Sequence, residues 1–170
     1  MKNNLFYGGE VDGFKYTDKE YNRKTGSYYW VTTRLLRESG PWPASHIKTP
    51  EDVYELAKEQ LDIENLDREH FIALYLNRKG VILAAETISV GGLHSSIVHP
   101  REVFKPALLV SAASIIVLHN HPSGDPTPSQ PDIDITNRLI AAGEVIGIEV
   151  IDHVVIGHNT WVSLKARGFI

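Results

Sequence analysis

The run of residues 114–119, SIIVLH, is the feature that most restricts how this chain can fold. Its apolar residues are continuous rather than alternating with polar ones, which predicts a strand buried on both faces. Predicted helices and strands alternate around it along the chain. This order predicts an α/β fold in which helices flank a mixed β-sheet.

The remaining elements follow from periodicity and from residues that favour turns and caps. The expected strands are residues 71–77, 81–90, 114–119, 149–156 and 160–164. One helix begins at Pro50 with Thr49 as its N-cap, and its apolar residues recur at helical spacing. Residues 99–102 favour a second helix start, but Pro106 predicts that this helix is short, kinked or displaced toward residues 107–113. A third helix is expected over residues 129–142, ended by Gly143.

Composition limits the kinds of site that the chain can build. The 170 residues are those of one ordinary globular domain, and none of them is cysteine. Disulfides, thiolate zinc fingers and cysteine nucleophiles are therefore excluded. Any transition-metal site must use the eight histidines together with Asp or Glu.

Charge and the chain ends bear on partners and location. The formal net charge is −4, which lacks the basic excess typical of proteins that bind a phosphate backbone, so no nucleic-acid binding is expected. The N-terminus has no long apolar stretch like that of a signal peptide, and no apolar run is long enough for a membrane helix. We therefore expect a cytoplasmic protein that does not contact a membrane.

Residues 1–44 differ from the rest of the chain. They are rich in Gly, Asn, Lys and Tyr, contain several turn-forming pairs, and include a stretch of strand propensity at residues 28–33. The sequence GPWP at residues 40–43 favours a boundary. We interpret residues 1–44 as an N-terminal arm or hairpin of unknown role and residues 45–170 as the main domain.

The candidate chemistry lies directly after the buried strand. Side chains two residues apart in an extended backbone point to the same side, so His119 and His121 can direct both imidazoles to one point. Ser129 follows seven residues after His121, and Asp132 three residues later. Ser129 and Asp132 also form a capping-box pattern, and capping alone is the simpler interpretation of that pair.

Capping and metal binding are compatible, because the cap places Asp132 in the first turn of the helix, beside the end of the loop. Two His and one Asp leave an open position on a four-coordinate zinc, and catalytic sites keep water there. Zinc lowers the pKa of that water to about 7. An isolated His-x-His pair is more often two exposed or turn-forming histidines, but here the strand, the loop and the helix start occur together.

His119, His121, Ser129 and Asp132, at this spacing, resemble the zinc signature of the JAMM or MPN+ metalloprotease family. The sequences of three stretches are similar to those of the RadC branch of that family: HNHPSG at 119–124, VHPREV at 98–103 and GIEVIDH at 147–153. The resemblance covers residues from about 45 to 170. It implies a JAMM/MPN fold, similar to that of cytidine deaminases, with zinc bound by His119, His121 and Asp132.

The resemblance also implies catalytic roles. Family members use an upstream glutamate as general base and a serine to stabilise the oxyanion, which correspond here to Glu69 and Ser129. Glu86 is the alternative base, because a one-residue slip of the strand would turn Glu69 away. His153, next to Asp152, invites a catalytic interpretation, but a histidine hydrogen-bonded inside the fold is the preferred one.

The expected function is a zinc-dependent peptidase or isopeptidase acting on an unidentified peptide or protein. The alternative is a catalytically silent RadC-like binding module in DNA repair or a mobile-element process. Through that family association nucleic acid remains a possible partner, although the charge does not support it. The presence of every ligand type favours a competent metal site.

Overall fold

A computed structural model describes residues 9–11, 14–16, 46–91 and 98–170. The chain divides into two compact units, residues 1–33 and 34–170. In the first unit, β1 (Gly9–Val11) pairs antiparallel with β2 (Phe14–Tyr16). The interpretation of residues 1–44 as an arm or hairpin stays a prediction. The strand expected at residues 28–33 and the boundary expected at residues 40–43 lie outside the described residues.

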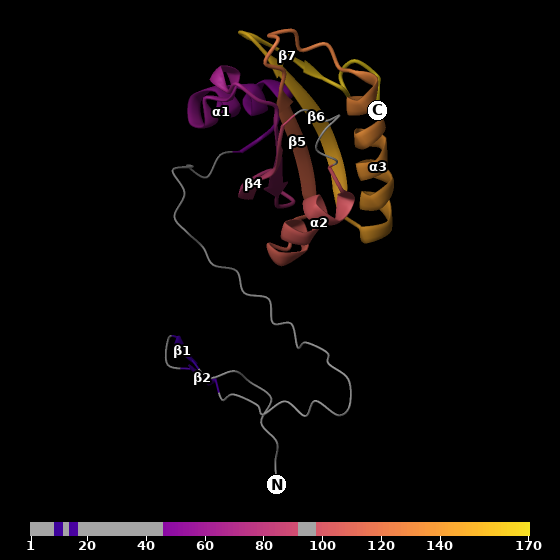
Figure 1. Cartoon of the computed structure of the whole chain (residues 1–170). Helices are drawn as coiled ribbons and strands as arrows, with labels where there is room; N and C mark the ends of the chain where they lie inside the picture. The colour runs from indigo at the N-terminus through magenta and orange to yellow at the C-terminus, as the bar shows by residue number, and fades with distance from the viewer. Residues whose placement is uncertain (1–8, 12–13, 17–45, 92–97) are drawn as a thin grey trace, which may run out of the picture. The chain divides into compact units, whose positions relative to one another are not determined.

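The second unit is built on a five-stranded mixed sheet in the order β4-β3-β5-β6-β7 (Figure 1). Its strands are β3 (His70–Leu76), β4 (Ile82–Val90), β5 (Ser114–Asn120), β6 (Glu149–Gly157) and β7 (Thr160–Ser163). Only β5 and β6 run parallel to one another among these neighbours, and the other pairs are antiparallel. The mixed sheet and its flanking helices confirm the predicted fold class.

Every residue of β5 is buried, as its uninterrupted apolar sequence predicts. One face of the sheet packs against α1 (Pro50–Leu61), and the other against α2 (Pro100–Leu109) and α3 (Gln130–Ile146). Figure 1 shows α1 on one side of the central strands and α3 on the other. Because side chains alternate along β5, Val117 packs on the α2/α3 face and Leu118 on the α1 face.

The strand register decides which side chains meet at the end of β5. Phe71 of β3 pairs with His119, so the start of β3 lies beside the first predicted metal ligand. The pairing of β5 with β6 shifts by one residue between Ile115 and Ile116. This shift is a β-bulge, and it changes which face of the sheet the following residues of β6 occupy.

The helix α2 corrects one prediction. It begins at Pro100, as expected, but it is not displaced toward residues 107–113, because it continues through Pro106 to Leu109. Pro106 removes one helical hydrogen bond. Its ring is buried in the core, and this apolar burial offsets the loss.

The helix α3 also extends beyond its predicted end. Gly143 lies inside the helix, where a Cβ atom would meet the carbonyl oxygen of Ile148 at 2.5 Å. The helix ends instead at Gly147, whose φ of +80° is the left-handed conformation of a C-cap. Gly143 therefore allows close packing, and Gly147 provides the stop. Among the described residues, no helix is both long enough and apolar enough to cross a membrane.

Candidate metal centre

Three of the predicted site residues converge in the structure. The Nε2 atom of His119 lies 3.0 Å from Nε2 of His121 and 3.3 Å from Oδ1 of Asp132. Nε2 of His121 lies 3.5 Å from Oδ2 of Asp132. These three residues form a group of side chains that could hold a metal ion.

Two elements bring the three residues together. His119 lies in β5 near its end, and His121 follows that strand directly. Asp132 lies in the first turn of α3, where Ser129 is the N-cap and both hydrogen bonds of a capping box are present. The capping-box interpretation is thus correct and coexists with convergence on the two histidines.

Asp132 uses its two carboxylate oxygens differently. Oδ2 accepts hydrogen bonds from the backbone N–H of Ser129 at 2.7 Å and from its hydroxyl at 2.6 Å. Oδ1 is buried and has no hydrogen-bond partner among the residues that the structure describes. A buried carboxylate oxygen without a donor is costly, so its position facing His119 favours a cation there.

The loop after β5 fixes the tautomer of His121. Its Nδ1 atom lies 2.7 Å from the carbonyl oxygen of Asp125. A carbonyl oxygen only accepts, so Nδ1 carries the proton and, in the neutral ring, Nε2 presents a lone pair to the site. The backbone N–H of Gly124 donates to the carbonyl oxygen of His121, which closes the turn that places Asp125.

His119 is neutral in this environment. It is fully buried and stacks on Phe71 with 6.1 Å between ring centroids. Burial lowers its pKa to about 4, although the charge of Asp132 acts in the opposite direction. His119 therefore enters the site as an uncharged nitrogen donor near pH 7.

His121 and Asp132 favour opposite charges. The hydrogen bond to Asp132 raises the pKa of His121, and the charge of Glu69 contributes in the same direction. Burial opposes ionisation of Asp132, but hydrogen bonds from His121 and Ser129 and the nearby His119 outweigh it and lower the pKa of the carboxyl. The metal-free site thus holds a carboxylate beside a histidine that readily accepts a proton.

The arrangement fits zinc. Metal–ligand bonds of about 2.0–2.1 Å in tetrahedral geometry place ligand atoms about 3.3–3.4 Å apart. The 3.0 Å between the two Nε2 atoms and the 3.3 Å from His119 Nε2 to Oδ1 of Asp132 lie close to that value, and Nε2 of His121 lies 3.5 Å from the other carboxylate oxygen, Oδ2. Two imidazole nitrogens and one carboxylate oxygen are also a donor set that zinc accepts.

The two candidate bases occupy different places. Glu69 directly precedes β3, is half-buried, and its backbone carbonyl accepts from Gly91. Because Phe71 pairs with His119, extension of this antiparallel register sets Glu69 across from His121. Glu86 is exposed in β4 and pairs with Ala73, which is further along β3 from the site, and its charge acts on Tyr75.

One residue that supports this site, Asn120, was not predicted from the sequence. Asn120, between the two histidines, is buried and faces the other side of the sheet. Its Oδ1 accepts from the backbone N–H of His70, and its Nδ2 donates to the carbonyl oxygen of Arg68. Asn120 therefore holds the segment that carries Glu69. Its position between the two histidines of HNH could have indicated this, because side chains alternate along a strand and the middle residue points to the opposite face.

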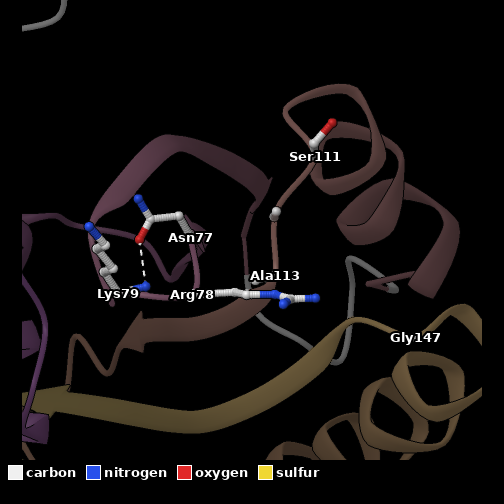
Figure 2. Close-up of a pocket in the computed structure, with 7 residues that line it drawn as sticks. Asn77, Arg78, Lys79, Ser111, Ala113 and Gly147 are labelled. Carbon is white, nitrogen blue, oxygen red and sulfur yellow. Dashed lines mark hydrogen bonds between the residues drawn. The ribbon is translucent and has the colours of Figure 1, made fainter.

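The structure also contains a hollow of about 580 Å³ away from this centre. It is lined by Asn77, Arg78, Lys79, Ser111, Ala112, Ala113 and Gly147. These residues lie where β3 ends and β5 begins, whereas the histidines lie at the other end of β5. Figure 2 shows the Arg78 and Lys79 side chains extending in opposite directions, so the two cations do not converge on one point.

The sequence of this chain is similar to those of several known proteins. A UPF0758 protein from Syntrophomonas wolfei subsp. wolfei is 62% identical over 126 residues, covering 73% of this chain and 54% of that protein. UPF0758 proteins from Desulforamulus reducens and Geobacillus kaustophilus are 61% identical over 124 residues and 49% identical over 137 residues. The chain spans 54% and 60% of the length of these two relatives. Residues 47–169 match the model of the RadC-like JAB domain. With its converging histidines and aspartate on a mixed α/β sheet, the chain belongs to the RadC-like JAB domain family.

Proposed function

We propose that this chain is a zinc-dependent hydrolase of the JAMM type that cleaves an amide or isopeptide bond in a peptide or protein. The observation that carries the proposal is the set of three convergent side chains, in which Oδ1 of Asp132 has no hydrogen-bond partner within the described part of the chain. Structural zinc sites are usually closed by four protein ligands, whereas catalytic sites leave one position open. The side chain of His121 is 15% exposed, so the group is accessible from that side.

His119, His121 and Asp132 are the residues that would hold zinc. A zinc ion supplies Lewis acidity, which lowers the pKa of water toward neutrality and polarises a carbonyl group. His119 contributes a neutral nitrogen, and Asp132 contributes a carboxylate that is already ionised. The protein therefore loses at most the proton of His121 when the metal binds.

Glu69 is the proposed general base. Its charge raises the pKa of His121, and the register of β3 and β5 favours a position opposite that ligand. A carboxylate there accepts a proton from water and passes it to the leaving amine. Asn120 supports this role, because it fixes the backbone on either side of Glu69.

Ser129 is the proposed donor to the oxyanion. Its hydroxyl now donates to Asp132 Oδ2, so donation to a substrate requires rotation of the Ser129 side chain. The backbone N–H of Ser129 also donates to Asp132 Oδ2 and retains the carboxylate during that rotation. The hydroxyl is thus close to the site without being the only support of the ligand.

The test uses the full 170-residue chain loaded with zinc and a library of quenched fluorescent peptides with amide and isopeptide bonds. Zinc content, measured by metal analysis, should approach one ion per chain and be lost in His121→Ala. Glu69→Gln should retain zinc and lose turnover, because the amide cannot act as the base. Glu86→Gln is the matched control and should retain both.

Each outcome separates the alternatives. A wild-type chain that binds no zinc contradicts the proposal. Zinc binding without any turnover favours the silent binding module instead. Loss of turnover in Glu86→Gln, with Glu69→Gln active, assigns the base to Glu86.

A further inference from the structure

A buried chain of hydrogen bonds connects two of the metal ligands through His153. Nδ1 of His119 lies 2.7 Å from Nε2 of His153, and Nδ1 of His153 lies 2.6 Å from the hydroxyl oxygen of Thr136. The Thr136 hydroxyl donates to the backbone carbonyl oxygen of Asp132. This series of hydrogen bonds therefore begins at the side chain of His119 and ends at the backbone carbonyl of Asp132.

The proton positions along this chain follow from the number of donors. A carbonyl oxygen only accepts, so the single proton of the Thr136 hydroxyl goes to Asp132. His153 must then donate from Nδ1 to Thr136, which leaves a lone pair on its Nε2 atom. His119 must in turn donate from Nδ1 to His153, which leaves a lone pair on its own Nε2 atom, toward Asp132.

The same number of available protons disfavours the other tautomer of His119, in which the proton is on Nε2. With its proton on Nε2, His119 would direct a lone pair from Nδ1 at the lone pair of His153, 2.7 Å away. Thr136, His119 and His153 are all fully buried, so water cannot relieve this repulsion. Burial also lowers the pKa of both histidines, which agrees with two neutral rings.

The bulge in β6 is what brings His153 to this place. His153 pairs with Val117, on the face of the sheet where His119 lies, and Asp152 pairs with Ile116, on the other face. Without the one-residue shift after Ile115, Asp152 would pair with Val117 and take the position of His153. Thr136 is one helical turn beyond Asp132, which places its hydroxyl above that residue's carbonyl.

We propose that His153 is a positioning residue that fixes the tautomer and ring orientation of His119 for metal binding, and that Thr136 sets the orientation of His153. The inference rests on the proposed metal site, but not on hydrolysis. Metal-binding histidines generally donate their second ring N–H to an outer partner, and loss of that partner weakens metal binding about 10–100-fold. Here the outer partner is a neutral imidazole.

The experiment measures zinc affinity of the full chain by competition with a chromogenic chelator. His153→Phe, which keeps a ring but no acceptor, should weaken zinc binding about 10–100-fold. His153→Gln should recover most of the affinity, because its amide oxygen accepts from His119. Thr136→Val should weaken binding, whereas Thr136→Ser, which retains the hydroxyl, should not.

A second readout reports the tautomer directly. Long-range ¹H–¹⁵N NMR of the metal-free wild type should show His119 protonated on Nδ1, and Thr136→Val should show both tautomers. Asp152→Asn is the matched control, because Asp152 is also buried and accepts from Ser163 and from the backbone N–H groups of His153 and Lys165, but does not contact the His153 ring. It should lower stability and leave zinc affinity unchanged.

The outcomes distinguish the two proposals. A wild type without zinc affinity overturns the metal site itself. A folded His153→Phe that binds zinc within about twofold of a zinc-binding wild type overturns only the role of His153. Should His153→Phe fail to fold, the Thr136 pair and the wild-type spectrum decide, and a His119 proton on Nε2 would contradict the inference.

Discussion

The hydroxyl of Ser129 donates to Oδ2 of Asp132 across 2.6 Å, while no described residue donates to Oδ1 of the same carboxylate. Asp132 thus contributes one oxygen to the capping box of α3 and presents the other to His119. Helix formation and ligand placement are therefore coupled, because the carboxylate that stabilises the first turn is held by that turn.

This coupling predicts different results for two substitutions of Asp132. Asp132→Asn keeps an oxygen that can accept from Ser129 but removes the charge, so zinc affinity should fall at least about 100-fold with α3 intact. Asp132→Ala should lose zinc as well and cost about 1 kcal/mol more in stability, because the bonds from Ser129 to the carboxylate are also lost. Chelator competition and urea unfolding of the metal-free variants measure the two effects. Equal stability of the two variants would contradict the coupling.

Acid should destabilise the metal-free protein between pH 6.5 and pH 4. Burial lowers the pKa of His119 from 6.5 to about 4, and burial lowers the pKa of His153 as well. In this window the unfolded chain binds protons that the folded chain does not. The free energy of unfolding therefore decreases as the pH is lowered through this window. His119 alone contributes about 3 kcal/mol to this decrease.

His121 acts with the opposite sign, because its raised pKa gives stability that is present below pH 6.5 and is lost as pH rises above that value. Urea unfolding with a chelator present, repeated across this pH range, measures the sum. His119→Asn, which cannot titrate, should show a smaller loss on acidification. An unchanged loss in that variant would assign the effect to other groups.

Removal of the Asn120 side chain should affect the segment that carries Glu69. Asn120→Ala leaves the backbone N–H of His70 without its partner and removes one of two contacts to the carbonyl oxygen of Arg68, at a cost of about 2 kcal/mol in stability. Amide exchange at His70 should accelerate, and zinc affinity should change little because Asn120 faces away from the ligands.

The matched control is Asn77, whose Oδ1 accepts from the backbone N–H groups of Lys79 and Val81 at the other end of β3. Asn77→Ala should lower stability but leave exchange at His70 unchanged. Loss of turnover in Asn120→Ala, but not in Asn77→Ala, would support Glu69 as the base. Equal exchange at His70 in both variants would contradict the role of Asn120.

A methyl group at Gly157 should disturb His121 through the backbone. A Cβ atom there would lie 2.3 Å from the carbonyl oxygen of Gly124, in the turn that places Asp125 against His121. Gly157→Ala should therefore weaken zinc binding about 10-fold or more. Gly147→Ala is the control: its φ of +80° strains an alanine by about 1 kcal/mol, but its Cβ meets nothing within 4 Å. Unchanged zinc affinity in Gly157→Ala would show that the turn adapts.

Most of the fold could be predicted from local patterns. The uninterrupted apolar run of β5 and the N-cap at Thr49 each produce the expected element. The predicted end of α3 at Gly143 was wrong, and so was a displacement of α2 toward residues 107–113, because tertiary packing outweighs local preference at Gly143 and Pro106. The ring of Pro106 is buried, and Gly143 allows close approach to the residue after the helix, so neither residue ends its helix.

The three converging residues at the candidate site were also predictable, because their spacing places two side chains on one face of a strand and the third in a capped helix turn. The outer partners were predictable only in part: His153 is hydrogen-bonded inside the fold, as expected, but its contact with His119 was not predicted. Whether Asp152 or His153 faces His119 depends on the bulge in β6, and no sequence pattern indicated that shift. The carbonyl of Asp125 is a backbone group, so its side chain carries no information about this contact.

The unequal exposure of the three ligand residues has a consequence for how an ion would arrive and leave. His119 and Asp132 are sealed within the core, and His121 alone of the three has a partly exposed side chain. Exchange with a chelator should then begin by detachment of His121, with the other two residues still in contact with the ion. The dissociation rate would depend on the mobility of the loop around Asp125, whereas the two sealed residues would chiefly set how strongly the ion is retained.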